Sequence, residues 1–121
     1  MAKAFDASTL ATLRTTEEIR IRTRKHKGQG VTIWIVTVGD QAFIRSFRGA
    51  QAKWYIDAIA DGQATLEVGG RQLAVRLTPV RDAATIEAVS QAYLKKYASS
   101  PYAKAMVAPE VLPTTLRVDP M

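Results

Sequence analysis

The sequence has 121 residues, enough for one domain with a buried core and too few for two domains. Its composition, 47% hydrophobic and 23% charged, is that of a globular protein, and the absence of cysteine excludes disulfides, thiolate metal sites and thiol nucleophiles. The net charge is +6, and no apolar run approaches the roughly 18 residues that cross a membrane.

The first thirty residues predict an arm and one half-exposed strand. Residues 1–16 have neither the apolar core nor the cleavage site of a signal peptide, so we expect a cytoplasmic protein that begins with an arm or a short helix. In residues 17–25 isoleucine or threonine alternates with arginine. This period of two predicts a strand with one face toward solvent, and residues 26–30 predict the turn after it.

Residues 31–47 predict a buried hairpin. The segment VTIWIVTV (31–38) is β-branched and apolar on both faces, which is typical of a central strand covered on both sides. Gly39 and Asp40 predict a turn, and residues 41–47 predict the partner strand.

From residue 51 the pattern changes to a helix and then to a second hairpin. Trp54 and Ala58 lie at helical spacing, so residues 51–61 predict a short helix. Residues 63–68 and 71–80 alternate on either side of two glycines, which predicts two strands joined by a tight turn.

The C-terminal third predicts a long helix and a last strand. Asp82 is a suitable helix cap, and an apolar stripe over residues 83–98 predicts a packing or dimer face. One further helical turn follows the break at Pro101. We place a strand over residues 111–118 at a sheet edge, because Pro113 cannot donate a backbone hydrogen bond.

This order of elements predicts a mainly β fold with helices (α+β): a small, closed or nearly closed six-stranded barrel. A short helix follows strand 3 and a longer helix follows strand 5. The single domain (1–121) then consists of an N-terminal arm or helix (1–16), the barrel core (17–80), a helix (82–98) and a C-terminal turn with the edge strand (99–121).

The positive charge is concentrated in one segment. Residues 20–53 contain eight Lys or Arg residues and one acid, so they carry +7 and the rest of the chain carries −1. A local excess of this kind predicts a site for an anion: a phosphate-bearing cofactor, nucleic acid or an acidic partner.

Arg45, Ser46 and Arg48 are the first candidates for such a site. Two guanidinium groups and a hydroxyl suit a phosphate, but alternation along a strand puts the two arginines on opposite faces. They reach one ligand only if the strand ends near Phe47 and the chain bends at Gly49. The alternative is that each arginine lies along the surface or pairs with an acid.

A second group of cations consists of Arg24, Lys25 and Lys27 in a glycine-containing loop. Consecutive amides and cations suit a phosphate, and the alternative is a solvated hairpin tip. His26 is the single histidine and has no metal-ligating neighbours in sequence, so we predict no metal site.

Trp54 and Tyr55 are the aromatic candidates. They either line a pocket for a ring system or, for at least one of the two, fill the core. The sequence shows no nucleophile with a neighbouring base and no paired carboxylates, so catalytic residues remain unknown. An enzyme built on this chain would depend on a bound cofactor.

The run from Val31 to Gly70 resembles the core of the FMN-binding split-barrel superfamily. It is most similar to the deazaflavin-dependent nitroreductase-like branch and to a related uncharacterised bacterial family, over about residues 17–80. The sequence departs from that branch at residues 24–30, where a glycine- and serine-rich basic loop lacks its serine. The parts that carry the resemblance occur in the family's order: Gly39-Asp40, Ser46 to Gly49, Trp54-Tyr55, Ala60 to Gln63 and Gly69-Gly70.

The resemblance implies a split-barrel homodimer that holds FMN or a deazaflavin in a groove between barrel and partner subunit. Such a protein would move a hydride between the reduced cofactor and a small organic acceptor. Two alternatives remain open: a non-enzymatic anion-binding module without a cofactor, and a basic nucleic-acid-binding barrel, which the burial of the aromatics within apolar runs disfavours. The predicted cofactor-binding residues are Arg24, Lys25, Lys27, Arg45, Ser46, Arg48, Trp54 and Tyr55.

Overall fold

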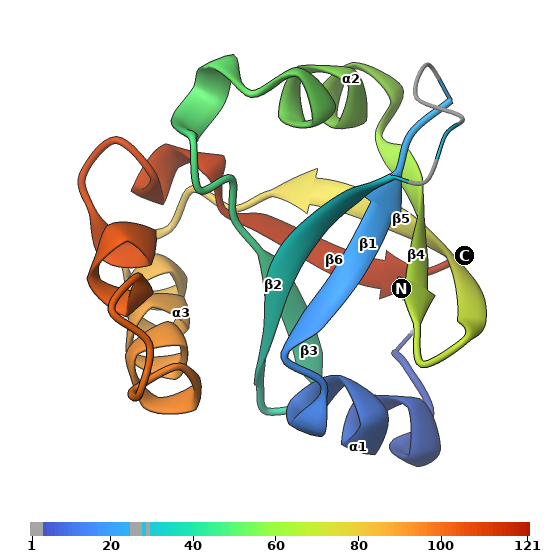
Figure 1. Ribbon diagram of the computed structural model, residues 1–121, viewed down its shortest axis with the longest axis horizontal. Coiled ribbons are helices and arrows are strands. Elements are labelled where there is room, and N and C mark those ends of the chain that lie inside the picture. The colour runs from blue at the N-terminus through green and yellow to red at the C-terminus, as the bar shows by residue number, and fades with distance from the viewer. Residues whose placement is uncertain (1–3, 25–27, 29) are drawn as a thin grey trace.

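A closed barrel of six antiparallel strands forms the centre of the protein (Figure 1). The computed structural model describes residues 4–24, 28 and 30–121. Around the barrel the strands follow the order β1-β2-β3-β6-β5-β4, and β4 pairs with β1 to close it. The predicted six-stranded barrel is confirmed. The strands are β1 (Glu18–Arg22), β2 (Val31–Val38), β3 (Gln41–Ile44), β4 (Gln63–Val68), β5 (Arg71–Pro79) and β6 (Leu116–Pro120).

Three α-helices surround the barrel. In Figure 1, α1 and α2 lie at its opposite ends, and α3 lies against its outer side beside β2. The predicted short helix after β3 and longer helix after β5 are confirmed, and Asp82 caps α3 by accepting from the Thr85 N–H at 2.9 Å. The helices are α1 (Ala7–Thr15), α2 (Lys53–Asp61) and α3 (Ala83–Lys96), with short 3₁₀ helices η1 (Gly49–Gln51), η2 (Ala103–Val107) and η3 (Leu112–Thr114).

Two apolar clusters hold these elements together. The first fills the barrel and includes Leu13 of α1 and Trp54 of α2, so helices close both of its ends. The second lies outside the barrel, between β2, β3 and α3, and includes Val36 and Tyr93. Residues of β2 enter both clusters, which confirms that this strand is covered on both faces.

The second hairpin follows from its two glycines. Val68 of β4 pairs with Arg71 of β5, so Gly69 and Gly70 form a two-residue turn. Their φ angles are 53° and 80°, a left-handed conformation that glycine adopts without a steric penalty and that suits the twist of a hairpin.

Two predictions about strands are wrong. β3 ends at Ile44 rather than at residue 47, because the Ser46 N–H donates to Thr114 Oγ1 instead of to a neighbouring strand. The last strand begins at Leu116 and is not at an edge, since it pairs with β3 on one side and β5 on the other. Pro113 lies before this strand, in η3, where its missing N–H interrupts no strand pairing.

Candidate functional site

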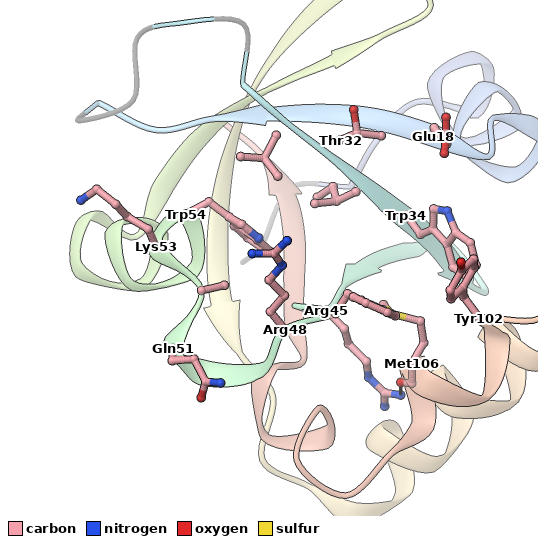
Figure 2. Close-up of a pocket in the computed structure, with 14 residues that line it drawn as sticks. Glu18, Thr32, Trp34, Arg45, Arg48, Gln51, Lys53, Trp54, Tyr102 and Met106 are labelled. Carbon is pink, nitrogen blue, oxygen red and sulfur yellow. Dashed lines mark hydrogen bonds between the residues drawn. The ribbon is translucent and has the colours of Figure 1, made fainter.

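A groove of about 1060 Å³ opens between β2, the segment that follows β3, and η2 (Figure 2). Cations, aromatic rings and aliphatic groups line it, together with two neutral polar side chains and a single acid. The lining residues are Glu18, Val31, Thr32, Ile33, Trp34, Arg45, Phe47, Arg48, Gln51, Ala52, Lys53, Trp54, Tyr102 and Met106.

The turn after β3 sends the two candidate arginines in different directions. The chain leaves the strand after Ile44, and the Gly49 N–H donates to the Ser46 carbonyl at 2.9 Å before α2 begins. Figure 2 shows Arg48 extending toward Trp54, whereas Arg45 extends toward Met106. The strand ends before Phe47, as it must if Arg45 and Arg48 are to reach one ligand. The two guanidinium groups nevertheless point in different directions.

Arg45 is a buried residue that connects the barrel to α3 and η2. It is 1% exposed, and its Nε donates to Thr115 Oγ1 at 2.8 Å. Its Nη1 donates to Ser90 Oγ at 3.0 Å and to the Met106 carbonyl at 2.9 Å, and its Nη2 donates to the Ile86 carbonyl at 2.8 Å. The contacts of the Arg45 side chain are therefore structural.

The charge of Arg45 has no carboxylate partner within the part of the chain that the structure describes. Burial lowers the pKa of Arg45, yet a guanidinium group remains charged near neutral pH. The Tyr93 ring lies 5.5 Å from the guanidinium carbon and adds a cation–π contact. The groove thus has a fixed positive charge behind its wall.

Ser46 stabilises the turn between β3 and η1. Its side chain is fully buried, and its hydroxyl donates to the Gly49 carbonyl at 2.7 Å. The hydroxyl proton is therefore already used within the protein. Ligand binding by Arg45 and Ser46 stays a prediction, and their observed contacts position the segment that carries Arg48.

Arg48 and Lys53 are the exposed cations of the groove. Lys53 Nζ lies 3.6 Å from Asp57 Oδ2, one helical turn further along α2. Arg48 forms no ion pair with any residue that the structure describes. Its guanidinium donors are therefore available to a ligand in the groove.

Trp54 and Tyr55 both belong to the core. Each is 7% exposed, and their rings meet edge to face with centroids 6.0 Å apart. Trp54 also lines the groove, whereas Tyr55 does not. Burial raises the pKa of Tyr55, which is consistent with an interior position.

Several aromatic lining residues were absent from the predicted site. Trp34 lies on the outer face of β2 and stacks on Tyr97 with ring centroids 3.8 Å apart and planes at 2°. Phe47 and Tyr102 are 52% and 60% exposed and meet edge to face at 6.0 Å. Alternation along residues 31–38 contains the signal for Trp34, but the approach of Tyr102 depends on a contact across 55 positions of the chain.

Arg24 lies outside the groove. Its Nε is 3.6 Å from Asp61 Oδ2, and it lines a second, smaller pocket. Lys25 and Lys27, together with His26, lie outside the described residues. Of the eight predicted site residues, the groove brings together Arg48, Trp54 and, from behind its wall, Arg45.

In residues 4–24, 28 and 30–121, no group of three His, Cys, Asp or Glu side chains is placed to hold a metal ion. Over the same ranges, no helix has the length and apolarity needed to cross a membrane.

Residues 9–118 match the family described as uncharacterised proteins conserved in bacteria (DUF2255). The chain belongs to this family. The match covers the whole barrel up to Val118, and thus every residue that lines the groove. No curated protein matches the chain.

Solved structures share the fold at low sequence identity, and at these identities the similarity shows the fold alone. A conserved hypothetical protein, Rv2991, from Mycobacterium tuberculosis has a TM-score of 0.67 at 10% identity, with 99% of this chain and 81% of that chain covered. A putative pyridoxamine 5'-phosphate oxidase from Listeria innocua has a TM-score of 0.61 at 10% identity, with 94% and 90% covered. An F420-H2 dependent reductase has a TM-score of 0.57 at 13% identity, with 84% and 90% covered. The split-barrel fold that the resemblance implies is thereby confirmed.

Proposed function

We propose that the groove binds FMN or a deazaflavin and that the protein transfers a hydride between the reduced cofactor and a small organic acceptor. The observation that carries this proposal is the lining of the groove. Arg48 and Lys53 are exposed, Arg45 adds a buried positive charge, and Glu18 is the one acid among the lining residues. A groove with this balance favours an anion over a neutral or cationic ligand.

The phosphate of the cofactor would be anchored by Arg48 and Lys53. A guanidinium group presents a planar fork of donors that matches a phosphate, and an ammonium adds a second charge. Arg45 and Ser46 would contribute indirectly, because their hydrogen bonds fix the turn that positions Arg48.

The ring of the cofactor would pack on the aromatic and aliphatic part of the groove. Trp34 is held rigidly by its stack on Tyr97, and Ile33 and Met106 line the same space. Flat apolar surfaces of this kind favour a planar ring system. The volume of about 1060 Å³ is sufficient for a ligand of cofactor size.

The bound cofactor would supply the redox chemistry, and the protein would anchor, orient and exclude water from it. No side chain of the groove is assigned a catalytic role. The fold supports the proposal, because it is shared with a putative pyridoxamine 5'-phosphate oxidase and with an F420-H2 dependent reductase.

The proposal includes a cytoplasmic homodimer whose partner subunit covers the groove. Phe47 and Tyr102 leave a large apolar area exposed at the groove, which a second subunit would bury. Light scattering should give twice the mass of one chain. A monomer at every concentration would contradict this part of the proposal.

A cofactor titration tests the central step. The purified protein should gain a visible spectrum and a higher melting temperature with FMN or a deazaflavin. Arg48→Met should weaken that binding about tenfold, the typical effect of losing a charge-assisted contact. Arg20→Met is the matched control, because Arg20 is exposed on β1 and lines neither pocket.

If neither FMN nor a deazaflavin changes the visible spectrum or the melting temperature of the protein, the proposal is wrong. If a cofactor binds, oxidation of its reduced form by small organic acceptors tests the hydride transfer. Binding without turnover would leave the chain as an anion-binding module and contradict the enzymatic part.

A further inference from the structure

The acid and the exposed cations of the groove lie on opposite sides of it. In Figure 2, Lys53 lies on one side of the groove, and Glu18 lies on the other side together with Trp34. Arg48 extends toward Trp54, the residue after Lys53. Glu18 is the one acid among the lining residues. A ligand that matches this distribution of charge has an anionic group at one end and hydrogen-bond donors at the other.

The pairing of β1 with β2 places Glu18 beside Trp34. The two residues are direct partners in the antiparallel register. Directly opposed residues point to the same face of a sheet, with Cβ atoms about 4.5–5.5 Å apart. Burial raises the pKa of Tyr97, and the negative charges of Glu17 and Glu18 add to the increase. Because Tyr97 stacks on Trp34, the charge of Glu18 acts at the aromatic wall of the groove.

The carboxylate of Glu18 is accessible to a ligand in the groove. Glu18 is exposed, and it forms no ion pair with any residue that the structure describes. Tyr97 covers one face of the Trp34 indole, and Trp34 also lines the groove. A planar ring that packs on Trp34 therefore brings one of its edges to Glu18.

The chemistry of a carboxylate decides which edge of a ring can lie there. An ionised carboxylate accepts hydrogen bonds and donates none, so Glu18 favours a ring edge that carries a donor. The oxidised ring systems of FMN and of deazaflavins have one such edge, where an imide N–H lies between two carbonyl groups. A hydrogen bond from this N–H to a charged acceptor is roughly twice as strong as a bond between neutral groups.

We propose that Glu18 is a specificity-determining residue of the groove, which accepts a hydrogen bond from the imide N–H of the bound ring; this role rests on the cofactor binding proposed above. The ring then packs at Trp34 with its imide edge toward Glu18, and the phosphate-bearing chain extends toward Arg48 and Lys53. Glu18 makes and breaks no covalent bond. It selects planar anions whose ring end carries an N–H donor over those whose ring end carries acceptors alone.

Calorimetric titration with FMN and with 3-methyl-FMN, in which a methyl group replaces the imide hydrogen, tests this contact. The corresponding pair of deazaflavins is measured in the same way. The parent protein should bind the N–H form about tenfold more tightly than the methylated form. Glu18→Leu should bind both forms alike. Because the preference is a ratio within one variant, a general change in affinity cancels from it.

Glu17→Leu is the matched control. Glu17 is exposed, carries the same charge as Glu18 and also acts on Tyr97, but it does not line the groove. This variant should keep the preference of the parent protein for the N–H form. An equal loss of preference in Glu17→Leu and Glu18→Leu would assign the effect to charge at a distance and would overturn the contact.

The remaining outcomes separate this contact from cofactor binding itself. If the parent protein binds the N–H and methylated forms equally, or if Glu18→Leu keeps the full preference, the role of Glu18 is wrong and the cofactor site stands. If no form of either ring binds to the parent protein, the cofactor site and the role of Glu18 are both wrong.

Discussion

Arg45 brings a positive charge into the interior and forms no ion pair with any described residue, although the charge of Glu87 acts on it from a greater distance. Two hydroxyls and two carbonyls accept its hydrogen bonds, and they come from α3, from η2 and from Thr115, the residue before β6. The same side chain therefore fixes the wall of the groove and makes its potential positive.

Replacing Arg45 should destabilise the fold, and replacing Arg48 should not. Arg45→Met leaves two buried hydroxyls and two carbonyls without their donor, so we expect a loss of about 2–4 kcal/mol in the free energy of unfolding. Arg48→Met removes an exposed side chain and should change the free energy of unfolding by less than about 0.5 kcal/mol. Urea denaturation measures both, and equal losses in the two variants would contradict the structural assignment.

The sequence alone identifies the stretch around Arg45 but cannot separate its two arginines. The partners of Arg45 lie 41 to 70 positions away in the chain, so no local pattern reveals them. The Arg48 side chain, in contrast, can reach a ligand in the groove, because the turn at Gly49 directs it away from the partners of Arg45. Helical spacing predicts the short helix that carries Trp54 and Tyr55, but it leaves open which of the two fills the core; in the structure both do, and Trp54 also lines the groove.

Lys96, at the end of α3, connects this helix to α1 and β2 by hydrogen bonds. Its ammonium donates to the carbonyls of Leu13 and Thr16, at the end of α1, and to that of Ile35 in β2. These distances are 2.9, 2.7 and 2.7 Å, so all three of its donors are used. A cation at the C-terminus of α1 is also favoured by the helix dipole.

The stability of the protein should depend on pH through Lys96. Burial lowers the pKa of Lys96 from 10.5 to about 8, so the folded state holds this proton less tightly than the unfolded state does. The contribution of Lys96 to stability therefore rises as the pH increases from about 8 to about 10.5.

Melting temperatures of the parent protein and of Lys96→Met across this range test the direction. The parent should gain stability relative to the variant as the pH rises. If the melting temperature of the parent protein falls relative to that of Lys96→Met as the pH rises, the folded state holds the proton more tightly than the unfolded state does.

The turn between β4 and β5 should tolerate substitution poorly at Gly70. Its φ of 80° disfavours a side chain, so Gly70→Ala should lower the free energy of unfolding by about 1–2 kcal/mol. Gly28→Ala is the control, since no atom of the described residues lies within 4 Å of a Cβ there and Gly28 is not among the described glycines with a left-handed φ. Equal effects of the two substitutions in thermal denaturation would contradict the turn.

The sequence predicts the hairpins of the barrel, but it does not predict how β6 pairs between β3 and β5. Period-two alternation and paired turn residues predict both hairpins, because these are local signals. The pairing of β6 between β3 and β5 joins Ala42 to Val118 and Leu77 to Val118. Such long-range register has no local signature, and the proline in residues 111–118 favoured an edge instead.

The barrel also separates cations that are continuous in the sequence. Arg24 and Arg48 both belong to the basic segment 20–53, yet they line two pockets with no residue in common. The predicted cations therefore do not all line a single pocket.

The groove is proposed to bind a flavin-type cofactor mainly through the phosphate group of that cofactor. Calorimetric titration with FMN and with riboflavin, the same ring without the phosphate, measures this directly, and a deazaflavin with and without its phosphate is measured in the same way. For at least one ring we expect saturable binding that is about tenfold tighter with the phosphate, with the difference lost in Arg48→Met. No binding of any of these compounds, or equal binding with and without the phosphate, would contradict the account.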